Sequence, residues 1–255
     1  MTALKDKTAL VTGASRGIGR ATASALADAG ARVLVHYGRS AQEAASLVDD
    51  IRAKGGRADA IRADLGTPDG ATLLAKEVRS MIGERLDVLV SNAGISKSAT
   101  IRDHSLEDFD NLFATNVRSP FFLVQQLLPI LGEGSNIIVI SSLGARAVVG
   151  MPDLDKPSIL AYAATKGAIE TLVKYWAGIL GPRGIRVNAV APGVIDTDMS
   201  NFAKTEAGRS VAIGMQALKR IGKPEDVADV VAFLASDAAR WITGASIPVD
   251  GGSKL

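Results

Sequence analysis

Short apolar runs rich in β-branched residues alternate with longer helical patterns up to about residue 190, and this alternation constrains the fold most strongly. The runs are Thr8–Thr12, Arg32–His36, Ala58–Arg62, Val88–Ser91, Ile137–Ile140 and Arg186–Val190. They are apolar almost throughout, which is typical of parallel strands buried on both faces. Helical patterns such as Ala41–Ala53 lie between them. The sequence therefore predicts an α/β fold, with a doubly wound parallel sheet and helices on both faces.

The 255 residues suffice for one large domain or two small ones. No linker, low-complexity tract or internal repeat divides them, so we expect a single domain over residues 1–255. The alternation breaks at about 143–161 and 196–216, after the last two predicted strands. Ligands bind beyond the carboxyl ends of the strands in this architecture, so we expect both segments to be substrate loops.

Composition excludes several kinds of site and partner. The chain has no cysteine and only His36 and His104, so we expect no disulfide, metal site, Cys nucleophile or Ser-His-Asp triad. A net charge of +2 with interspersed signs predicts no nucleic-acid or membrane partner. No apolar run reaches the length of a membrane span, and residues 1–7 do not form a signal peptide. We expect a soluble cytoplasmic protein, although Ser253–Leu255 spells S-K-L, a peroxisomal address in eukaryotes.

The first predicted strand leads into TGASRGIG (Thr12–Gly19) and then into a helical pattern. Its glycines, at 13, 17 and 19, do not have the G-x-G-x-x-G spacing of a common dinucleotide loop. A strand, a glycine turn and a helix nevertheless form a phosphate cradle, because glycines allow close approach and the helix start offers N–H groups to a pyrophosphate. Three glycines by themselves leave an ordinary turn as the alternative.

Tyr162 and Lys166 are four residues apart at the start of a helical pattern, so they share one face. A phenol titrates near 10, and a neighbouring ammonium should lower that pKa by favouring the phenolate. The pair is therefore suited to donating and accepting a proton as a carbonyl and an alcohol interconvert.

Five motifs in register resemble those of the short-chain dehydrogenases/reductases. TGASRGIG fits the pattern T-G-x-x-x-G-x-G, and it is followed by Asp64-Leu65, Ser91–Gly94, Tyr162–Lys166 and Pro192-Gly193. The resemblance extends to Val249–Gly252 and is greatest to 3-oxoacyl-carrier-protein reductases and broad-specificity carbonyl reductases. It implies a Rossmann fold of about seven strands, a small carbonyl or alcohol substrate, and a homodimer or homotetramer.

The same resemblance implies the roles of individual residues. The catalytic set would be Asn116, Ser142, Tyr162 and Lys166. Ser142, rather than Ser141, would hold the substrate oxygen, and Asn116 would hold a water behind the lysine. The implied cofactor contacts are Gly13, Ser15, Gly17, Ile18, Gly19, Asp64, Leu65, Asn92, Ala93, Gly94, Pro192, Gly193, Val194 and Thr197. Asp64 would contact the adenine or simply cap its turn, and the segment from Pro192 would contact the nicotinamide.

The end of the second predicted strand indicates which nicotinamide cofactor binds. An acidic residue there would hydrogen-bond the ribose 2′-hydroxyl of NAD. This chain has Tyr37 at that position, with Arg39 close behind it and Arg16 in the cradle. Two guanidinium groups and no carboxylate suit a 2′-phosphate, so we expect NADP(H).

The sequence leaves several alternatives to a ketone reductase. An NAD-dependent sugar, polyol or other secondary-alcohol dehydrogenase is one alternative. Nucleotide-sugar epimerases and dehydratases have a different glycine loop and a larger C-terminal domain, and enoyl reductases space their Tyr and Lys more widely. A non-catalytic NADP-sensing module belongs to another class, and such modules often lose the Tyr or Lys that this chain keeps.

Overall fold

The computed structural model describes residues 3–149 and 153–253, and its strands form one seven-stranded parallel sheet in the order β3-β2-β1-β4-β5-β6-β7. The strands are β1 Thr8–Val11, β2 Arg32–Tyr37, β3 Arg57–Arg62, β4 Val88–Ser91, β5 Asn136–Ile140, β6 Arg186–Pro192 and β7 Ser246–Val249. Every neighbouring pair is parallel. The chain winds outward from β1 in one direction and from β4 in the other, which confirms the predicted doubly wound sheet.

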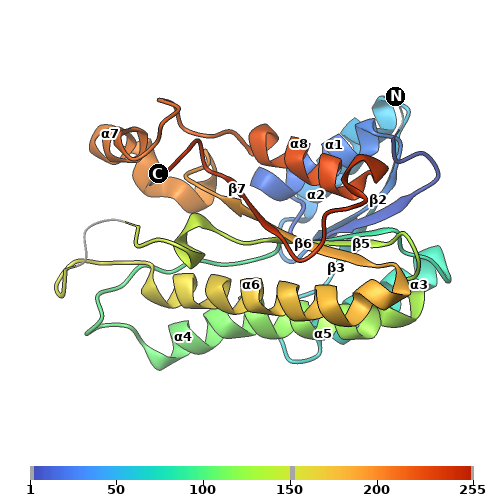
Figure 1. Ribbon diagram of the computed structural model, residues 1–255, viewed down its shortest axis with the longest axis horizontal. Helices are drawn as coiled ribbons and strands as arrows, with labels where there is room; N and C mark the ends of the chain where they lie inside the picture. Colours follow the sequence, from blue (N-terminus) through green and yellow to red (C-terminus); the bar gives the residue numbers. More distant parts are fainter. Residues whose placement is uncertain (1–2, 150–152, 254–255) are drawn as a thin grey trace.

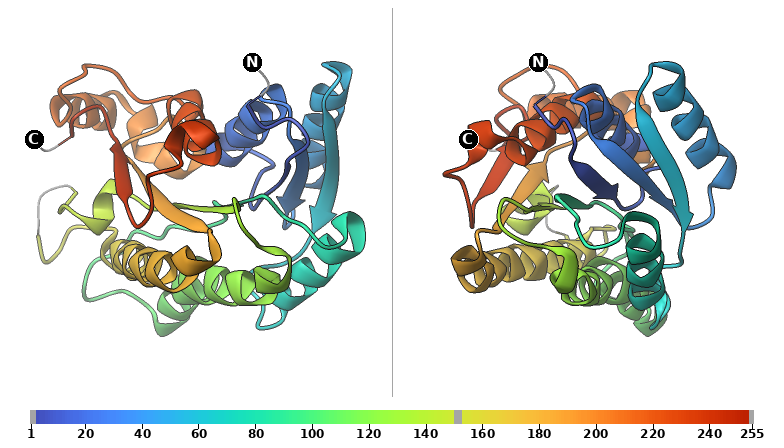
Figure 2. Two further views of the ribbon diagram at one scale, coloured as in Figure 1. Left: turned by 45° about the vertical axis from the view of Figure 1, so that its right-hand side comes forward. Right: turned by 90° about the vertical axis from the view of Figure 1, so that its right-hand side faces the viewer.

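Helices cover both faces of the sheet, as Figures 1 and 2 show. Helices α1, α2 and α8 pack on one face, and α3, α5 and α6 pack on the other, with α4 beside α6. The helices are α1 Gly17–Asp28, α2 Ala41–Ala53, α3 Gly70–Ile82, α4 Leu106–Phe113, α5 Ser119–Leu127, α6 Leu160–Leu180, α7 Glu206–Gly214 and α8 Pro224–Ala235. Helix α2 has the predicted bounds.

Successive side chains of each strand point into different cores, which explains why the strands are apolar throughout. In β1, Ala9 and Val11 pack under α1 and α8, whereas Leu10 packs under the helices of the opposite face. All three are fully buried. The central strands therefore have no solvent-facing side, and their carboxyl ends are fixed points on which a site can be built.

The two long connections after β5 and β6 lie at the same end of the sheet, on the left in Figure 1. The first forms a short 3-10 turn and then a loop up to α6, and the predicted loop includes residues 150–152, which lie outside the described residues. The prediction of a loop over 196–216 was wrong, because this segment contains a 3-10 helix, Asp198–Lys204, and then α7. Thr205 starts α7, since its Oγ accepts a hydrogen bond from Gly208 N at 3.1 Å.

Candidate active site

The glycine turn between β1 and α1 has the geometry of a phosphate cradle. Gly13 and Gly17 have φ angles of +62° and +56°, in the left-handed region that favours glycine. A Cβ on Gly19 would collide with the Gly13 carbonyl and would lie 2.5 Å from Asn92 Nδ2. The first N–H groups of α1 have no partner within the helix, so they are available to a pyrophosphate.

Asn92, at the end of β4, holds the cradle in place. Its Nδ2 donates to the carbonyl oxygens of Thr12, at 2.8 Å, and Gly13, at 3.0 Å. The backbone amides of Asn92 and Ala93 both donate to Thr12 Oγ1 at 3.0 Å. The Asn92-Ala93-Gly94 segment therefore lies beside the cradle.

Three of the predicted catalytic residues meet where β5 ends and α6 begins. The hydroxyl of Tyr162 lies beside Ser142, which acts to lower the pKa of the phenol. Lys166, one turn further along α6, has its Nζ 5.6 Å from the centre of the Tyr162 ring. The same Nζ donates to the carbonyl oxygen of Ile140, the last residue of β5, at 2.7 Å. The arrangement joins the helix that carries the Tyr-Lys pair to the strand that ends beside Ser142.

Burial controls the ionisation of the pair. The side chains of Tyr162 and Lys166 are buried, and Tyr162 packs with Leu112 of α4 and Ala161. Burial raises the pKa of Tyr162, and the hydrogen bond with Ser142 offsets only part of this rise. The prediction of a lowered tyrosine pKa was therefore wrong for this structure, because desolvation of the phenolate outweighs other effects. The same cause lowers the pKa of Lys166 from 10.5 to about 8.

These values predict a pH dependence. The Lys166 ammonium, which would stabilise a developing phenolate, loses its proton above about pH 8. We expect kcat/KM for ketone reduction to be level below this pH and to fall about tenfold per unit above it. Tyr162 keeps its proton in this range, because its pKa is raised. A profile that stays level until the ordinary lysine pKa of 10.5 would contradict this assignment.

Deprotonation of Lys166 does not destabilise the folded chain, so unfolding would not explain the fall in kcat/KM. Between pH 8 and 10.5 the unfolded chain binds more protons at this residue than the folded chain does. The free energy of unfolding therefore rises with pH in that interval as far as Lys166 is concerned. Melting curves recorded at each pH would serve as the control.

The two serines after β5 have different environments. Ser141 Oγ donates to Glu170 Oε1 at 3.0 Å, and the same carboxylate is bound by Arg146 Nε and by Ser246 Oγ. Ser142 Oγ instead accepts from Gly144 N at 3.1 Å and meets the Tyr162 hydroxyl. The geometry therefore favours Ser142 as the serine that would contact a substrate oxygen.

Substituting each serine tests this distinction. Ser142→Ala removes the donor beside Tyr162, and we expect kcat to fall by roughly 10²–10³-fold, as for loss of an oxyanion donor. Ser141→Ala is the matched control, because Glu170 keeps its other partners, and its kcat should change by less than about tenfold. Steady-state kinetics of the two variants decide the assignment, which a larger loss in Ser141→Ala would reverse.

Asn116 lies in a π-helical turn, Ala114–Arg118, between α4 and α5. Its Oδ1 accepts from Ile95 N at 2.9 Å, and its Nδ2 donates to Ile95 O at 2.9 Å and to Thr165 Oγ1 at 3.1 Å. Both amide hydrogens are therefore used to join the segment after β4 to the helix that carries Lys166. A Cβ on Gly94 would lie 3.2 Å from Asn116 Oδ1 and 3.7 Å from Lys166 Nζ, so this segment passes directly against both side chains.

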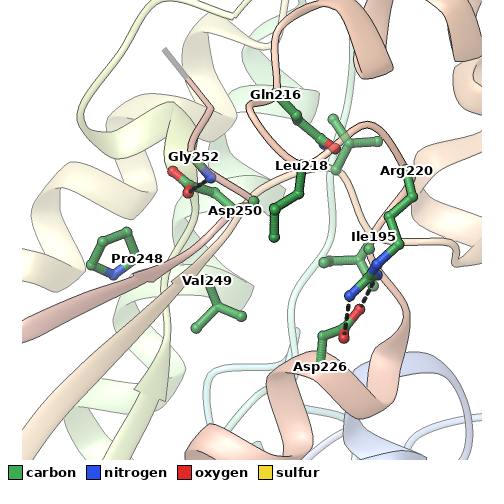
Figure 3. Close-up of a pocket in the computed structure, with 12 residues that line it drawn as sticks. Ile195, Gln216, Leu218, Arg220, Asp226, Pro248, Val249, Asp250 and Gly252 are labelled. Carbon is green, nitrogen blue, oxygen red and sulfur yellow. Dashed lines mark hydrogen bonds and ion pairs between the residues drawn. The ribbon is translucent and has the colours of Figure 1, made fainter. Parts of the chain in front are cut away.

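The segment after β6 faces the cradle. A Cβ on Gly17 would lie 3.3 Å from the Thr197 methyl group, so Thr197 covers the start of α1. Gly193 lies against Asp250, which a Cβ there would approach to 2.8 Å. Behind Val194 and Ile195, a cavity of about 300 Å³ opens toward the end of β7 and the residues that follow it (Figure 3). The predicted nicotinamide segment is thus placed between the cradle and this cavity.

Of the residues predicted to select the cofactor, Arg16 lies in the cradle turn, and Tyr37 and Arg39 lie at the end of β2 and just after it. Tyr37 is half-buried at the end of β2, and the guanidinium groups of Arg16 and Arg39 are exposed. Arg16 Nη1 lies 3.5 Å from the Asp198 carboxylate, and both side chains are exposed, so this pair is weak. Asp64 accepts a hydrogen bond from Gly66 N at 2.9 Å and therefore caps the turn after β3, as the alternative reading proposed. Leu65 is buried beside it.

Two residues near the site have contacts that the sequence did not reveal. His36 was noted only as one of two histidines, yet its ring nitrogens lie against the cradle and the end of β3. Glu170 was not singled out, although it follows Lys166 by one helical turn and therefore shares its face. The spacing of four residues from Lys166 is the sequence feature from which a position of Glu170 near the site could have been predicted.

Two features are absent from the described residues, 3–149 and 153–253: a cluster of metal ligands and a helix able to span a membrane. No group of three or more His, Asp or Glu side chains there is arranged to hold a metal ion. None of the helices in this part is both long and apolar enough to cross a membrane.

Comparison with known proteins gives consistent matches over nearly the whole chain. A family model described as "Enoyl-(Acyl carrier protein) reductase" matches residues 13–254. A versicolorin reductase of Emericella nidulans is 42% identical over an alignment of 262 positions, gaps included. The alignment covers 98% of this chain and 96% of the relative. The 3-oxoacyl-[acyl-carrier-protein] reductase of Staphylococcus epidermidis is 41% identical over 248 residues, which cover 97% of this chain and 98% of the relative. The crystal structure of an angucycline C-6 ketoreductase with bound NADP superimposes with a TM-score of 0.89 and 40% identity, covering 98% and 96%.

Proposed function

The chain belongs to the short-chain dehydrogenase/reductase family, and from this we propose that it is an NADP(H)-dependent oxidoreductase that interconverts a ketone and a secondary alcohol. The observation that carries the proposal is that Tyr162 lies beside Ser142 with Lys166 one turn away, and that Gly94, next to the cradle segment, passes against Lys166. These groups can polarise a carbonyl oxygen and supply it with a proton. Gly19 lets α1 start directly against the Gly13 carbonyl and Asn92, because a Cβ there would collide with both, and the compact turn that results is suited to a dinucleotide.

In the proposed reaction, the substrate carbonyl oxygen lies between the hydroxyls of Ser142 and Tyr162. NADPH, when bound, supplies the hydride that reduces the carbonyl carbon. Tyr162 gives its proton to the oxygen as negative charge develops there, and Ser142 stabilises that charge by a hydrogen bond. The raised pKa of Tyr162 keeps it protonated and ready for reduction. Lys166 stabilises the tyrosinate that forms, and we propose that Asn116 holds a water through which Tyr162 regains a proton.

We propose reduction of a ketone rather than of a carbon–carbon double bond. The description of the matching family model names an enoyl reductase, but Tyr162 and Lys166 have the four-residue spacing expected of ketone reductases. The named relatives reduce versicolorin or a 3-oxoacyl group, or are called a ketoreductase. These relatives support polycyclic ketones and 3-oxoacyl thioesters as the first substrates to test.

A panel of such ketones, followed by loss of the reduced nicotinamide, tests the proposal. NADPH and NADH are compared at equal concentration with each ketone. We expect turnover of at least one substrate, with a lower KM for NADPH than for NADH. Tight binding of NADPH without turnover of any ketone would favour a sensing module instead.

The preference for NADPH should depend on the two arginines at the edge of the cradle. Arg16→Ala and Arg39→Ala each remove a cation that would pair with the 2′-phosphate. We expect each to raise the KM for NADPH roughly tenfold, from loss of a charge-assisted hydrogen bond. NADH, which has no 2′-phosphate, is the internal control, and its KM should not change. Equal effects on both cofactors would contradict this role.

We further propose that the chain forms a homodimer or homotetramer through α5, α6 and β7. What supports this is the apolar surface of the monomer: Phe121 and Phe122 on α5 and Tyr175 on α6 are exposed. Trp241, just before β7, is 97% exposed. Contiguous apolar patches on a monomer mark protein–protein interfaces, and we propose that these side chains contribute to such a patch. Light scattering of the purified protein measures the number of subunits.

We also propose that the enzyme acts in the cytoplasm. The near balance of 29 Lys and Arg with 27 Asp and Glu supports this, because it gives no strong attraction to nucleic acid or to acidic lipid. Residues 254 and 255 of the C-terminal S-K-L lie outside the described residues. Cell fractionation with an antibody against the chain tests the location.

A further inference from the structure

The buried side chain of His36 connects the cradle to the neighbouring strand and has no part in the chemistry above. Its Nδ1 lies 3.0 Å from Gly13 N, and its Nε2 lies 3.1 Å from Ala63 O, just after β3. Its own carbonyl oxygen accepts from Ala14 N at 2.8 Å. His36 therefore binds the amides of two successive cradle residues and also the residue that precedes Asp64.

The partners of the ring determine its tautomer. The amide of Gly13 can only donate a hydrogen bond, so Nδ1 is the acceptor. The carbonyl oxygen of Ala63 can only accept, so Nε2 carries the hydrogen. Burial lowers the pKa of His36 to about 4, and the ring is therefore neutral near pH 7, with one donor and one acceptor. Each ring nitrogen thus matches the group that it faces.

We propose that His36 is a positioning residue of the dinucleotide site, holding the cradle turn through Nδ1 and the end of β3 through Nε2. The inference rests on the proposed function, because it assumes that NADPH binds at the cradle. In this arrangement the ring sets the spacing between the cradle, which receives the pyrophosphate, and the turn of Asp64, which borders the adenosine. Because the amides of Gly13 and Ala14 both donate to His36, a phosphate would be bound by the N–H groups at the start of α1 instead.

Loss of the Nδ1 acceptor should affect binding of the cofactor more than catalysis. Gly13 has a φ of +62° and no side chain to restrict it, so its amide depends on His36 for a fixed direction. Without that bond the part-buried N–H group of Gly13 lacks its partner, and the turn is then held only by Asn92 Nδ2 on Gly13 O and by the His36 carbonyl on Ala14 N. NADPH must then restore the turn on binding. The proposed catalytic residues Ser142, just after β5, and Tyr162 and Lys166, on α6, have no hydrogen bond to the ring, and they should keep their arrangement.

Two isosteric variants separate the two nitrogen contacts. His36→Asn places Oδ1 where Nδ1 lies, so it can still accept from Gly13. His36→Gln places its amide nitrogen near the position of Nε2, so it can still donate to Ala63 but cannot accept from Gly13. His36→Leu removes both contacts. The dissociation constant for NADPH is measured by the fluorescence of the bound nicotinamide, together with thermal melting and with kcat at saturating NADPH.

We expect NADPH to bind His36→Asn within about threefold of the wild type, and to bind His36→Gln about tenfold or more weakly. His36→Leu should bind at least as weakly as His36→Gln, with kcat at saturating NADPH unchanged in every folded variant. If His36→Leu does not fold, the comparison of Asn with Gln decides the result. Lower melting temperatures with an unchanged dissociation constant for NADPH would overturn the role of His36. Equal weakening of NADPH binding in His36→Asn and His36→Gln would also overturn it. Failure of the wild type to bind NADPH would remove the proposed function and this role together.

Discussion

Replacing Tyr162 with phenylalanine should reduce ketone turnover by roughly 10²–10⁴-fold, the range that a positioned proton donor contributes. The substitution removes a single oxygen atom, the hydroxyl oxygen that lies beside Ser142. The phenyl ring can still pack against Leu112 and Ala161. Lys166 also keeps its hydrogen bond to Ile140 O at 2.7 Å. The loss should therefore appear in kcat and not in the binding of NADPH.

Tyr175→Phe is the matched control for this experiment. Tyr175 lies on the same helix, but its side chain is exposed, and the resemblance gives it no part in the reaction. Its kcat should equal that of the wild type, and NADPH should bind both variants with wild-type affinity. Turnover by Tyr162→Phe close to the wild-type rate would show that another group supplies the proton.

Replacing Gly19 with alanine should abolish tight binding of the cofactor. The added methyl group would collide with the carbonyl of Gly13 and would lie 2.5 Å from Asn92 Nδ2. Relief of that collision requires the cradle to move away from the segment after β4, which Asn92 holds by hydrogen bonds of 2.8 and 3.0 Å. Forcing an extra carbon into such a packed site costs about 1–3 kcal/mol. We expect the dissociation constant for NADPH to rise at least tenfold, with a lower melting temperature.

Gly178→Ala provides the comparison for Gly19→Ala. Gly178 lies within α6 on an exposed face, and a Cβ there would meet no atom within 4 Å. Alanine has a higher helix propensity than glycine, so this variant should be as stable as the wild type or more stable by up to about 1 kcal/mol. It should bind NADPH normally. Normal binding by Gly19→Ala as well would mean that the cradle does not receive the cofactor.

Local patterns were sufficient to predict most of the fold. The sheet was predictable because strands buried on both faces are apolar throughout, and α2 because its apolar residues have helical spacing. Helix α7 was missed, although Thr205 followed by Glu206 is a typical helix start. Its single buried residue, Ala212, gives too weak an apolar pattern to predict a helix.

The site was predictable where its residues are close in the sequence or belong to a motif. Tyr162 and Lys166 share a helix face, and the Ser142 assignment came from the resemblance. The direction of the tyrosine pKa shift was not predictable, because the burial of Tyr162 depends on Leu112 of α4, fifty positions earlier in the chain. The role of His36 was hidden for a similar reason. Its partners, Gly13 and Ala63, become neighbours only when β1, β2 and β3 lie side by side.

The most direct test of the proposed reaction is the position of a deuterium label after reduction with deuterated NADPH. A 3-oxoacyl thioester and the corresponding 2-enoyl thioester are each incubated with the enzyme, and the products are examined by mass spectrometry and NMR. We predict that the 3-oxoacyl substrate gives a 3-hydroxyacyl product with deuterium on its carbinol carbon, and that the enoyl substrate is unchanged. Deuterium on a saturated acyl product formed from the enoyl thioester, with the ketone unreduced, would contradict the account.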